Sequence, residues 1–186
     1  MNRHIVALTG LSGVGKSTLL HKLASNLDFQ HLQASALIKE GRRLAKRDHL
    51  SLDQLRDLNL DENQRILIQS FRLNANQTST VIVLDGHTII EQGDDVTPIA
   101  PSVFGAIAIT SMILLTDDPT AIAQRRASDL NRQRPEKAID HLRAVQHAAQ
   151  AQAETICRVL DVPLHVFAQS QHDDIANLLR SYLDQR

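Results

Sequence analysis

A glycine-rich segment near the start of the chain has the residues needed to hold a phosphate chain. Residues 10–17 read GLSGVGKS and match the pattern G-x-x-x-x-G-K-[ST] in full. The glycines let the backbone fold into a concave nest whose N–H groups point at anionic oxygens, and the helix that follows adds partial positive charge. In such a loop Lys16 is expected to reach the β- and γ-phosphates of a nucleoside triphosphate, and Ser17 to bring its hydroxyl to Mg²⁺.

The same motif predicts a full set of phosphate contacts for ATP, with Thr18 on the side of the α-phosphate. The alternative is a glycine turn that only joins a strand to a helix, but the loop, the lysine, the hydroxyl and the flanking pattern all favour a phosphate loop. The motif leaves the reaction open, because transporter ATPases, GTPases and small-molecule kinases share it. The residues predicted to contact the phosphates are Gly10, Ser12, Gly13, Val14, Gly15, Lys16, Ser17 and Thr18.

Four arginines gather further along the chain, in RRASDLNRQRP at residues 125–135. Guanidinium groups suit phosphoryl oxygens because their planar forks bind two oxygens at once. We therefore predict a short lid at about residues 125–137, in which the catalytic side chains Arg125, Arg132 and Arg134 neutralise the charge on the phosphoryl group in transfer. The alternative is a solvated charged turn.

Two polar residues follow the apolar run in VIVLDGH, residues 81–87. A carboxylate at the end of a buried strand beside a phosphate loop is where the water ligands of Mg²⁺ are usually held, and Asp85 occupies that place. The alternative for Asp85 is a helix cap or a turn residue. His87 is either a contact for the phosphoryl acceptor or a polar loop residue. We place Asp85 and His87 together on the acceptor side of the site.

The elements that must position these residues follow from the hydrophobic pattern. Short apolar runs alternate with longer amphipathic stretches, which is typical of a doubly wound α/β domain. We predict a P-loop NTPase three-layer sandwich with a central, mostly parallel five-stranded sheet, helices on both faces and a small lid. One domain is expected over 1–186, with an acceptor-binding helical region at about 33–75. The predicted strands are 5–8, 29–33, 81–84, 112–115 and 164–167, and the predicted helices are 17–26, 35–46, 51–74, one from Pro119, one from Pro135 to about Leu160, and 173–183.

The composition weighs against several other classes. The 186 residues carry a net charge of −1, so no overall basic field favours nucleic acid, and only four Phe and one Tyr are present for base stacking. No apolar run approaches the roughly 20 residues of a membrane helix, and the N-terminal apolar stretch is too short for a signal peptide. Cys157 is the single cysteine, so no disulfide forms within the chain. We expect a soluble, cytoplasmic protein that binds neither membrane nor nucleic acid.

These motifs together resemble those of the archaeal-type adenylate kinases, a branch of the P-loop nucleoside monophosphate kinases. The resemblance extends over the whole chain. It includes the TG-x-x-G-V-G-K-S-T loop, the D-x-H turn at 85–87, the spacing R-x-x-x-D-x-x-R-x-R at 125–134, a P-x-x-P at 98–101 and the C-terminal helix. It implies transfer of the γ-phosphoryl group of ATP to AMP, giving two ADP, with Mg²⁺ as cofactor, and it makes a homo-oligomer possible.

The acceptor side of this resemblance is less complete. The segment LRDLNLDENQ at 55–64 looks like the family's helix that faces the acceptor nucleotide, which makes Arg56 a candidate contact for the AMP phosphate or else an exposed helix charge. Glu91 stands where the family often has arginine, and EQGDDV at 91–96 is acidic where an acceptor phosphate would pass. Another nucleoside monophosphate is therefore an open alternative.

Two further alternatives belong to other functional classes. The chain could be a P-loop kinase for a sugar, an acid or a nucleoside, which the acceptor residues would distinguish. It could also be a switch or assembly factor that hydrolyses ATP slowly to change a partner. A kinase acting on nucleic-acid ends would need a basic channel, and the near-neutral charge disfavours it.

Overall fold

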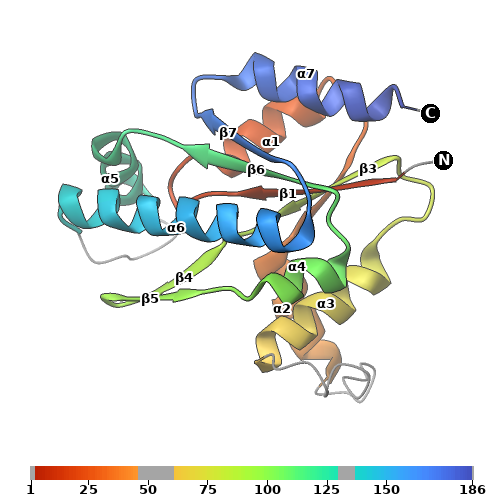
Figure 1. Ribbon diagram of the computed structural model, residues 1–186, viewed down its shortest axis with the longest axis horizontal. Coiled ribbons are helices and arrows are strands. Elements are labelled where there is room, and N and C mark those ends of the chain that lie inside the picture. Colours follow the sequence, from red (N-terminus) through yellow and green to blue (C-terminus); the bar gives the residue numbers. More distant parts are fainter. Residues whose placement is uncertain (1–2, 46–60, 130–136, 186) are drawn as a thin grey trace.

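The computed structural model describes residues 3–45, 61–129 and 137–185. Its centre is a five-stranded sheet in the order β2-β3-β1-β6-β7, and every neighbouring pair in it is parallel. A separate antiparallel hairpin of β4 and β5 lies beside the sheet (Figure 1). The strands are β1 (His4–Thr9), β2 (Gln30–Gln33), β3 (Val81–Asp85), β4 (Ile89–Gln92), β5 (Asp95–Pro98), β6 (Ser111–Thr116) and β7 (Leu164–Ala168).

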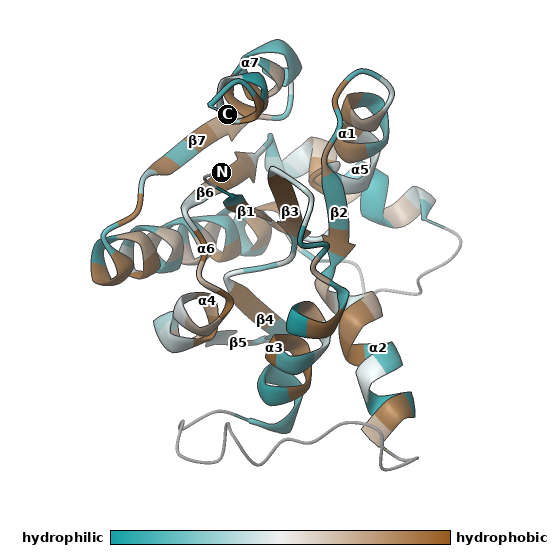
Figure 2. Ribbon diagram, turned by 90° about the vertical axis from the view of Figure 1, so that its right-hand side faces the viewer, coloured by the Kyte–Doolittle hydropathy of each residue, from teal (hydrophilic) through white to brown (hydrophobic). Residues whose placement is uncertain are grey.

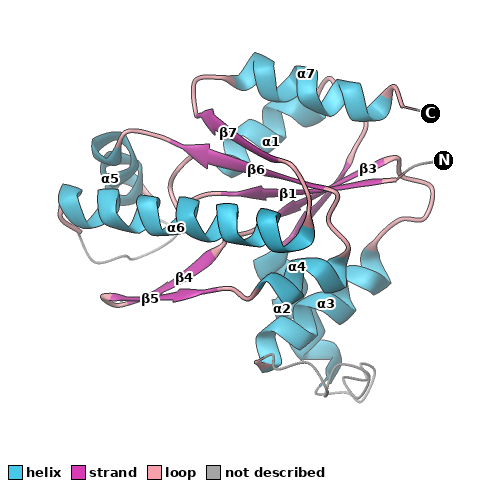
Figure 3. Cartoon of the chain, viewed as in Figure 1, coloured by secondary structure: helices cyan, strands magenta, loops and turns pink. Residues whose placement is uncertain are grey.

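Helices lie on both faces of this sheet, and Figure 3 separates them by colour from the strands. They are α1 (Lys16–Ala24), α2 (Ala34–Ala45), α3 (Glu62–Asn74), α4 (Pro101–Ile107), α5 (Pro119–Ser128), α6 (Ile139–Leu160) and α7 (His172–Leu183). The predicted α/β class, the five strands and their parallel arrangement are confirmed.

The three central strands β3, β1 and β6 are apolar on both faces because each face is covered. In β1, Ile5 and Ala7 belong to one buried cluster, which includes side chains of α3, α4 and α6. Val6 and Leu8 point the other way, into a second cluster with α1 and α7. Since successive strand side chains alternate between faces, continuous apolar runs require this three-layer arrangement. Figure 2 shows β3 and β6 largely in the hydrophobic colour.

The strand register brings the candidate site together. Leu8 near the end of β1 lies opposite Asp85 at the end of β3, and β2 ends at Gln33, which also lies opposite Asp85. The P-loop follows β1 directly, so Asp85 comes beside it at the carboxyl edge of the sheet. In open α/β sheets this edge is where ligands bind.

The structure differs from the predicted elements at two places. Asp61 has an extended backbone (φ −70°, ψ 165°) and its carboxylate accepts from Gln64 N, so α3 begins at Glu62. A continuous helix over 51–74 is therefore wrong; residues 51–60 lie outside the described residues, as does most of the predicted lid. The hairpin of β4 and β5 and the short helix α4 were not predicted, because their strands are only four residues long and largely polar.

Within the described residues, no helix has the length and apolar character needed to cross a membrane.

Candidate functional site

The P-loop has the backbone conformation that its glycines predict. Gly13 and Gly15 have φ of 86° and 104°, which strains residues other than glycine. A Cβ at Gly10 would lie 2.5 Å from the carbonyl oxygen of Leu115. Gly15 is also the N-cap of α1, and no side chain caps this helix. The first N–H groups of α1 therefore face the loop as anion-binding donors.

Lys16 lies at the base of the loop and is largely buried. Its Nζ donates to the carbonyl oxygen of Gly10 at 2.9 Å and lies 3.9 Å from Oδ1 of Asp85. Lys16 is 7% exposed and Asp85 5%, so little water screens the attraction between the two charges. A phosphate chain that follows the loop passes this ammonium group.

Asp85 is the last residue of β3, and its carboxylate is paired at the bottom of the cleft. Oδ2 lies 3.8 Å from Nε2 of His31, while Oδ1 faces Lys16. Asp85 and the hydroxyl of Ser17 line the same cleft. No cluster of three or more metal-ligating side chains occurs among the described residues. The oxygen donors fit Mg²⁺, which is usually held by one or two carboxylates, waters and substrate phosphates.

His87 is fixed by the same carbonyl that Lys16 uses. Its Nδ1 lies 2.8 Å from the oxygen of Gly10, and since a carbonyl oxygen only accepts, Nδ1 is the donor. The residue is exposed on the cleft wall. Protein atoms around the ring nevertheless exclude enough water to lower the pKa of His87 to about 4, and the charge of Lys16 lowers it further. Near neutral pH the ring is uncharged, with Nε2 carrying the lone pair.

Two consecutive arginines at the end of α5 hold the P-loop from outside. Arg125 Nε donates to the carbonyl of Gly13 at 2.7 Å, and its NH2 group pairs with Asp117. Arg126 Nε donates to the carbonyl of Ser12 at 2.8 Å. In a trans peptide the C=O and the following N–H point in opposite directions. Holding these two carbonyls therefore directs the N–H groups of the next residues away from α5.

Arg126 also binds the hairpin, through a two-pronged ion pair with Glu91 of β4. The shorter contact, from NH2 to Oε1, is 2.7 Å. Sequence reasoning noted Arg126 only as one member of the arginine cluster and gave it no role. It also noted Glu91 only as an acidic departure. The signal that could have revealed their contact was the presence of an acidic residue, Glu91, where the family often has arginine, together with an arginine, Arg126, beside the predicted lid.

The phosphate cleft, formed around the P-loop, has a volume of about 760 Å³. The end of β2 and the start of α2, at residues 33–35, also line it. Nine of the predicted site residues line it together: Ser12, Gly13, Gly15, Lys16, Ser17, Thr18, Asp85, His87 and Arg125. Gly10 and Val14, which were also predicted, are buried. Arg56, Arg132 and Arg134 lie outside the described residues, so their roles stay predictions.

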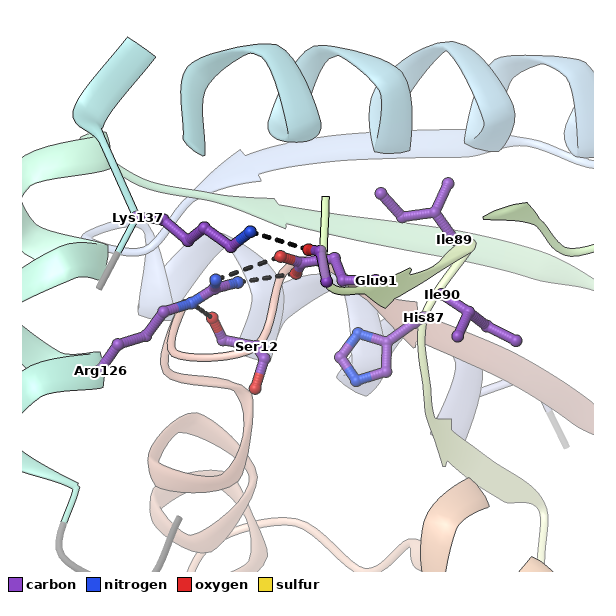
Figure 4. Close-up of a pocket in the computed structure, with 8 residues that line it drawn as sticks. Ser12, His87, Ile89, Ile90, Glu91, Arg126 and Lys137 are labelled. Atoms are coloured by element: carbon purple, nitrogen blue, oxygen red, sulfur yellow. Dashed lines mark hydrogen bonds and ion pairs between the residues drawn. The ribbon is translucent and has the colours of Figure 1, made fainter. Parts of the chain in front are cut away.

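A second pocket adjoins the phosphate cleft and has a volume of about 350 Å³ (Figure 4). We call it the hairpin pocket, because β4 and its turn form one wall. It shares Ser12 and His87 with the phosphate cleft. Its lining residues are Ser12, His87, Ile89, Ile90, Glu91, Gly93, Arg126 and Lys137.

The fold and the loop together define a P-loop protein of the kinase-like α/β type. The family model AAA_17, described as an AAA domain, matches residues 9–143, and the chain belongs to this family. No curated protein matches the chain significantly.

Solved structures of P-loop kinases have the same fold over nearly the whole chain. A shikimate kinase from Bacteroides thetaiotaomicron superposes with a TM-score of 0.52 at 16% identity, covering 97% of this chain and 98% of its own. A gluconokinase from Sinorhizobium meliloti 1021 gives 0.52 at 14% identity, covering 97% and 91%. A sugar kinase from Janibacter sp. HTCC2649 gives 0.51 at 18% identity, covering 99% and 95%. At these identities the likeness establishes the fold alone.

These comparisons support a P-loop kinase in general and not the archaeal-type adenylate kinases in particular. The narrower resemblance continues to depend on the sequence motifs.

Proposed function

We propose that this chain is an ATP- and Mg²⁺-dependent phosphotransferase that moves the γ-phosphoryl group of ATP to a small-molecule acceptor. The observation that carries the proposal is the convergence of Lys16 and His87 on the carbonyl oxygen of Gly10, with Asp85 beside them in a cleft. This arrangement puts a cation, a carboxylate and a neutral polar ring around the position of the terminal phosphates. A loop that only joins a strand to a helix needs none of the three.

The chain's residues act by binding and orienting, without a protein nucleophile. The P-loop N–H groups and Lys16 hold the β- and γ-phosphates, and Arg125 keeps the loop in shape through Gly13. Bound Mg²⁺ supplies charge neutralisation at the phosphates, and Ser17 and Asp85 are the side chains that would hold it, Asp85 through water. Arg132 and Arg134 are proposed to cover the phosphoryl group and exclude water.

A non-nucleotide acceptor has more structural support than AMP. The guanidinium groups of Arg125 and Arg126 are paired with Asp117 and Glu91, so neither offers an uncompensated charge to an acceptor phosphate. The similar solved structures, named as a shikimate kinase, a gluconokinase and a sugar kinase, have this fold. Nucleoside monophosphates, AMP first, are the second candidate, which the D-x-H turn at 85–87 and the spacing of the arginines at 125–134 favour.

The test is incubation with MgATP and a panel of sugars, hydroxy acids and nucleoside monophosphates, followed by separation of the phosphorylated products. A product that depends on the acceptor is expected, together with stoichiometric ADP. Steady release of inorganic phosphate, unaffected by every acceptor, would instead indicate an ATP-hydrolysing switch and would contradict the proposal.

A further inference from the structure

A part-buried ion pair forms one wall of the hairpin pocket. The side chain of Arg126 is 9% exposed and that of Glu91 22%, and they bind through two parallel hydrogen bonds. A guanidinium group has five N–H donors, and three of those of Arg126 are used by Glu91 and Ser12. The pair therefore presents both hydrogen-bond donors and carboxylate lone pairs to a ligand in the pocket.

The hairpin pocket lies where a phosphoryl acceptor is expected, next to the part of the cleft that would hold the terminal phosphates. His87, whose ring is held beside Lys16 by their shared bond to Gly10, separates the hairpin pocket from the phosphate cleft and lines both. Since Lys16 marks the expected place of the terminal phosphates, a molecule in the hairpin pocket would lie next to them, across Ser12 and His87. The attacking oxygen must approach from the side away from the leaving ADP, and a pocket that adjoins the cleft gives an acceptor room to do so.

The residues that line the pocket are suited to a neutral, polar ligand that has one apolar side. The charge of Arg126 is balanced by Glu91, and that of Lys137 by Asp94, with Lys137 Nζ also donating to Gly93 O at 2.8 Å. Ile90, which is only partly buried on β4, provides apolar surface, whereas Ile89 is 5% exposed and belongs to the core. Figure 4 shows Arg126, Glu91 and Lys137 gathered on one side of the pocket, with Ile89 and Ile90 on the other. An anionic ligand would have to compete with the carboxylates for both cations.

We propose that the hairpin pocket is the acceptor subsite and that it binds a small, uncharged molecule with several hydroxyl groups, of the sugar or polyol class. This inference rests on the proposed phosphotransferase function. Hydroxyl groups donate to Glu91 and accept from Arg126 and Lys137, while the carbon skeleton packs on Ile90.

The transfer that follows is balanced in atoms and charge. An oxygen of one acceptor hydroxyl forms a bond with the γ-phosphorus, and the bond from that phosphorus to the β,γ-bridging oxygen breaks. ADP leaves with that electron pair, and the hydroxyl proton is released to the water of the cleft.

The decisive experiment compares three acceptor groups with MgATP: glycerol, xylitol, D-ribose and D-glucose as neutral compounds, D-gluconate as a hydroxylated anion, and AMP, CMP, GMP and UMP. The expected product is the phosphate ester of a neutral compound. The variant Glu91→Gln should raise the KM for that acceptor about tenfold or more, since a charged acceptor of hydrogen bonds is lost. The KM for MgATP should change less than about threefold.

A second variant and a control distinguish a loss of acceptor binding from a loss of folding. Lys137→Met should also raise the acceptor KM, and it leaves the Arg126–Glu91 pair intact. Asp95→Asn removes the same charge from an exposed position on β5 that does not line the pocket, and its kinetics should match the wild type. Thermal unfolding of each variant shows whether the chain still folds.

Three results would overturn the inference. They are preference for a nucleoside monophosphate, preference for D-gluconate over the neutral compounds, and an acceptor KM that Glu91→Gln leaves unchanged. In each of these cases the phosphotransferase function itself survives. Phosphate release with no phosphorylated product from any group would overturn the proposed function and this inference together.

Discussion

Arg125 and Arg126, consecutive residues at the end of α5, donate through Nε to two consecutive carbonyl oxygens of the P-loop, those of Gly13 and Ser12. The arrangement assigns Arg125 a role in the shape of the loop as well as the predicted role in transfer. A role in loop shape affects nucleotide binding, whereas a role in the transition state affects turnover.

Arg125→Lys should weaken binding of ADP about tenfold, because a lysine ammonium cannot hold Gly13 O and Asp117 in the same planar arrangement. Isothermal titration with ADP measures this directly. Arg143→Lys, on the exposed face of α6, is the matched control and should bind ADP normally. Unchanged ADP affinity with a lower kcat would show that Arg125 acts only in transfer.

Lys16→Ala should lower kcat by about 10²–10³ or more, since the ammonium group is the buried cation at the terminal phosphates. Product formation from MgATP and the acceptor found in the panel measures this loss. Lys22→Ala, in the last turn of α1 on an exposed position, should retain full activity. Near-normal turnover of Lys16→Ala, with a circular dichroism spectrum like the wild type, would refute the assignment of the loop.

Asp85→Asn should raise the Mg²⁺ concentration needed for half-maximal activity, because an amide attracts a hydrated cation less than a carboxylate does. A titration of activity with Mg²⁺ at constant free ATP tests this. Asp173→Asn, exposed in the first turn of α7, provides the control. If Asp85→Asn shifts only the acceptor KM, Asp85 belongs to the acceptor side instead.

His87 should make the stability of the protein depend on pH in an acidic window. Its pKa falls from 6.5 to about 4 in the folded chain, chiefly through desolvation. Between these values the unfolded chain binds more protons, so the free energy of unfolding decreases as the pH falls from about 6.5 towards 4. Urea unfolding at pH 7.5 and 5.0 should show a larger loss for the wild type than for His87→Asn.

The comparison for this prediction is His147→Asn, an exposed position on α6. It should lose as much stability as the wild type over the same pH interval. An identical loss for His87→Asn and the wild type would show that the folded structure does not hold His87 neutral.

Arg134→Ala should lower kcat much more than it lowers affinity for ATP, if this arginine neutralises charge that develops during transfer. The corresponding measurements are kcat and the dissociation constant for ATP, with Arg143→Ala as the control. Equal losses in the two quantities would point to simple binding of the ground state.

The P-loop and the five strands were predictable from the sequence because their determinants are local. Residues 10–17 are contiguous, and glycine conformation and the helix start act within a few bonds of one another. Apolar runs such as 81–84 mark buried strands wherever they occur in an α/β chain. The hairpin of β4 and β5 was not predicted. Its strands have only four residues each, which is too short for an alternation of apolar and polar residues to indicate a strand.

Asp85 and His87 show how much of the site could be predicted from the sequence. Their place at the end of a strand predicted that they lie near the P-loop. Only the structure shows that His87 and Lys16 share one carbonyl of Gly10, since this depends on the register of β1 against β3.

The amino-acid sequence by itself determined the phosphate loop, the α/β class and the five strands of the central sheet, since each follows from neighbouring residues. The tertiary structure decided which distant charges meet. Glu91 and Arg126 are 35 residues apart, and nothing local pairs them. They meet because the parallel sheet brings β3 beside the P-loop, and α5 returns its last turn to the same edge. The hairpin pocket that they line therefore exists only in the folded chain.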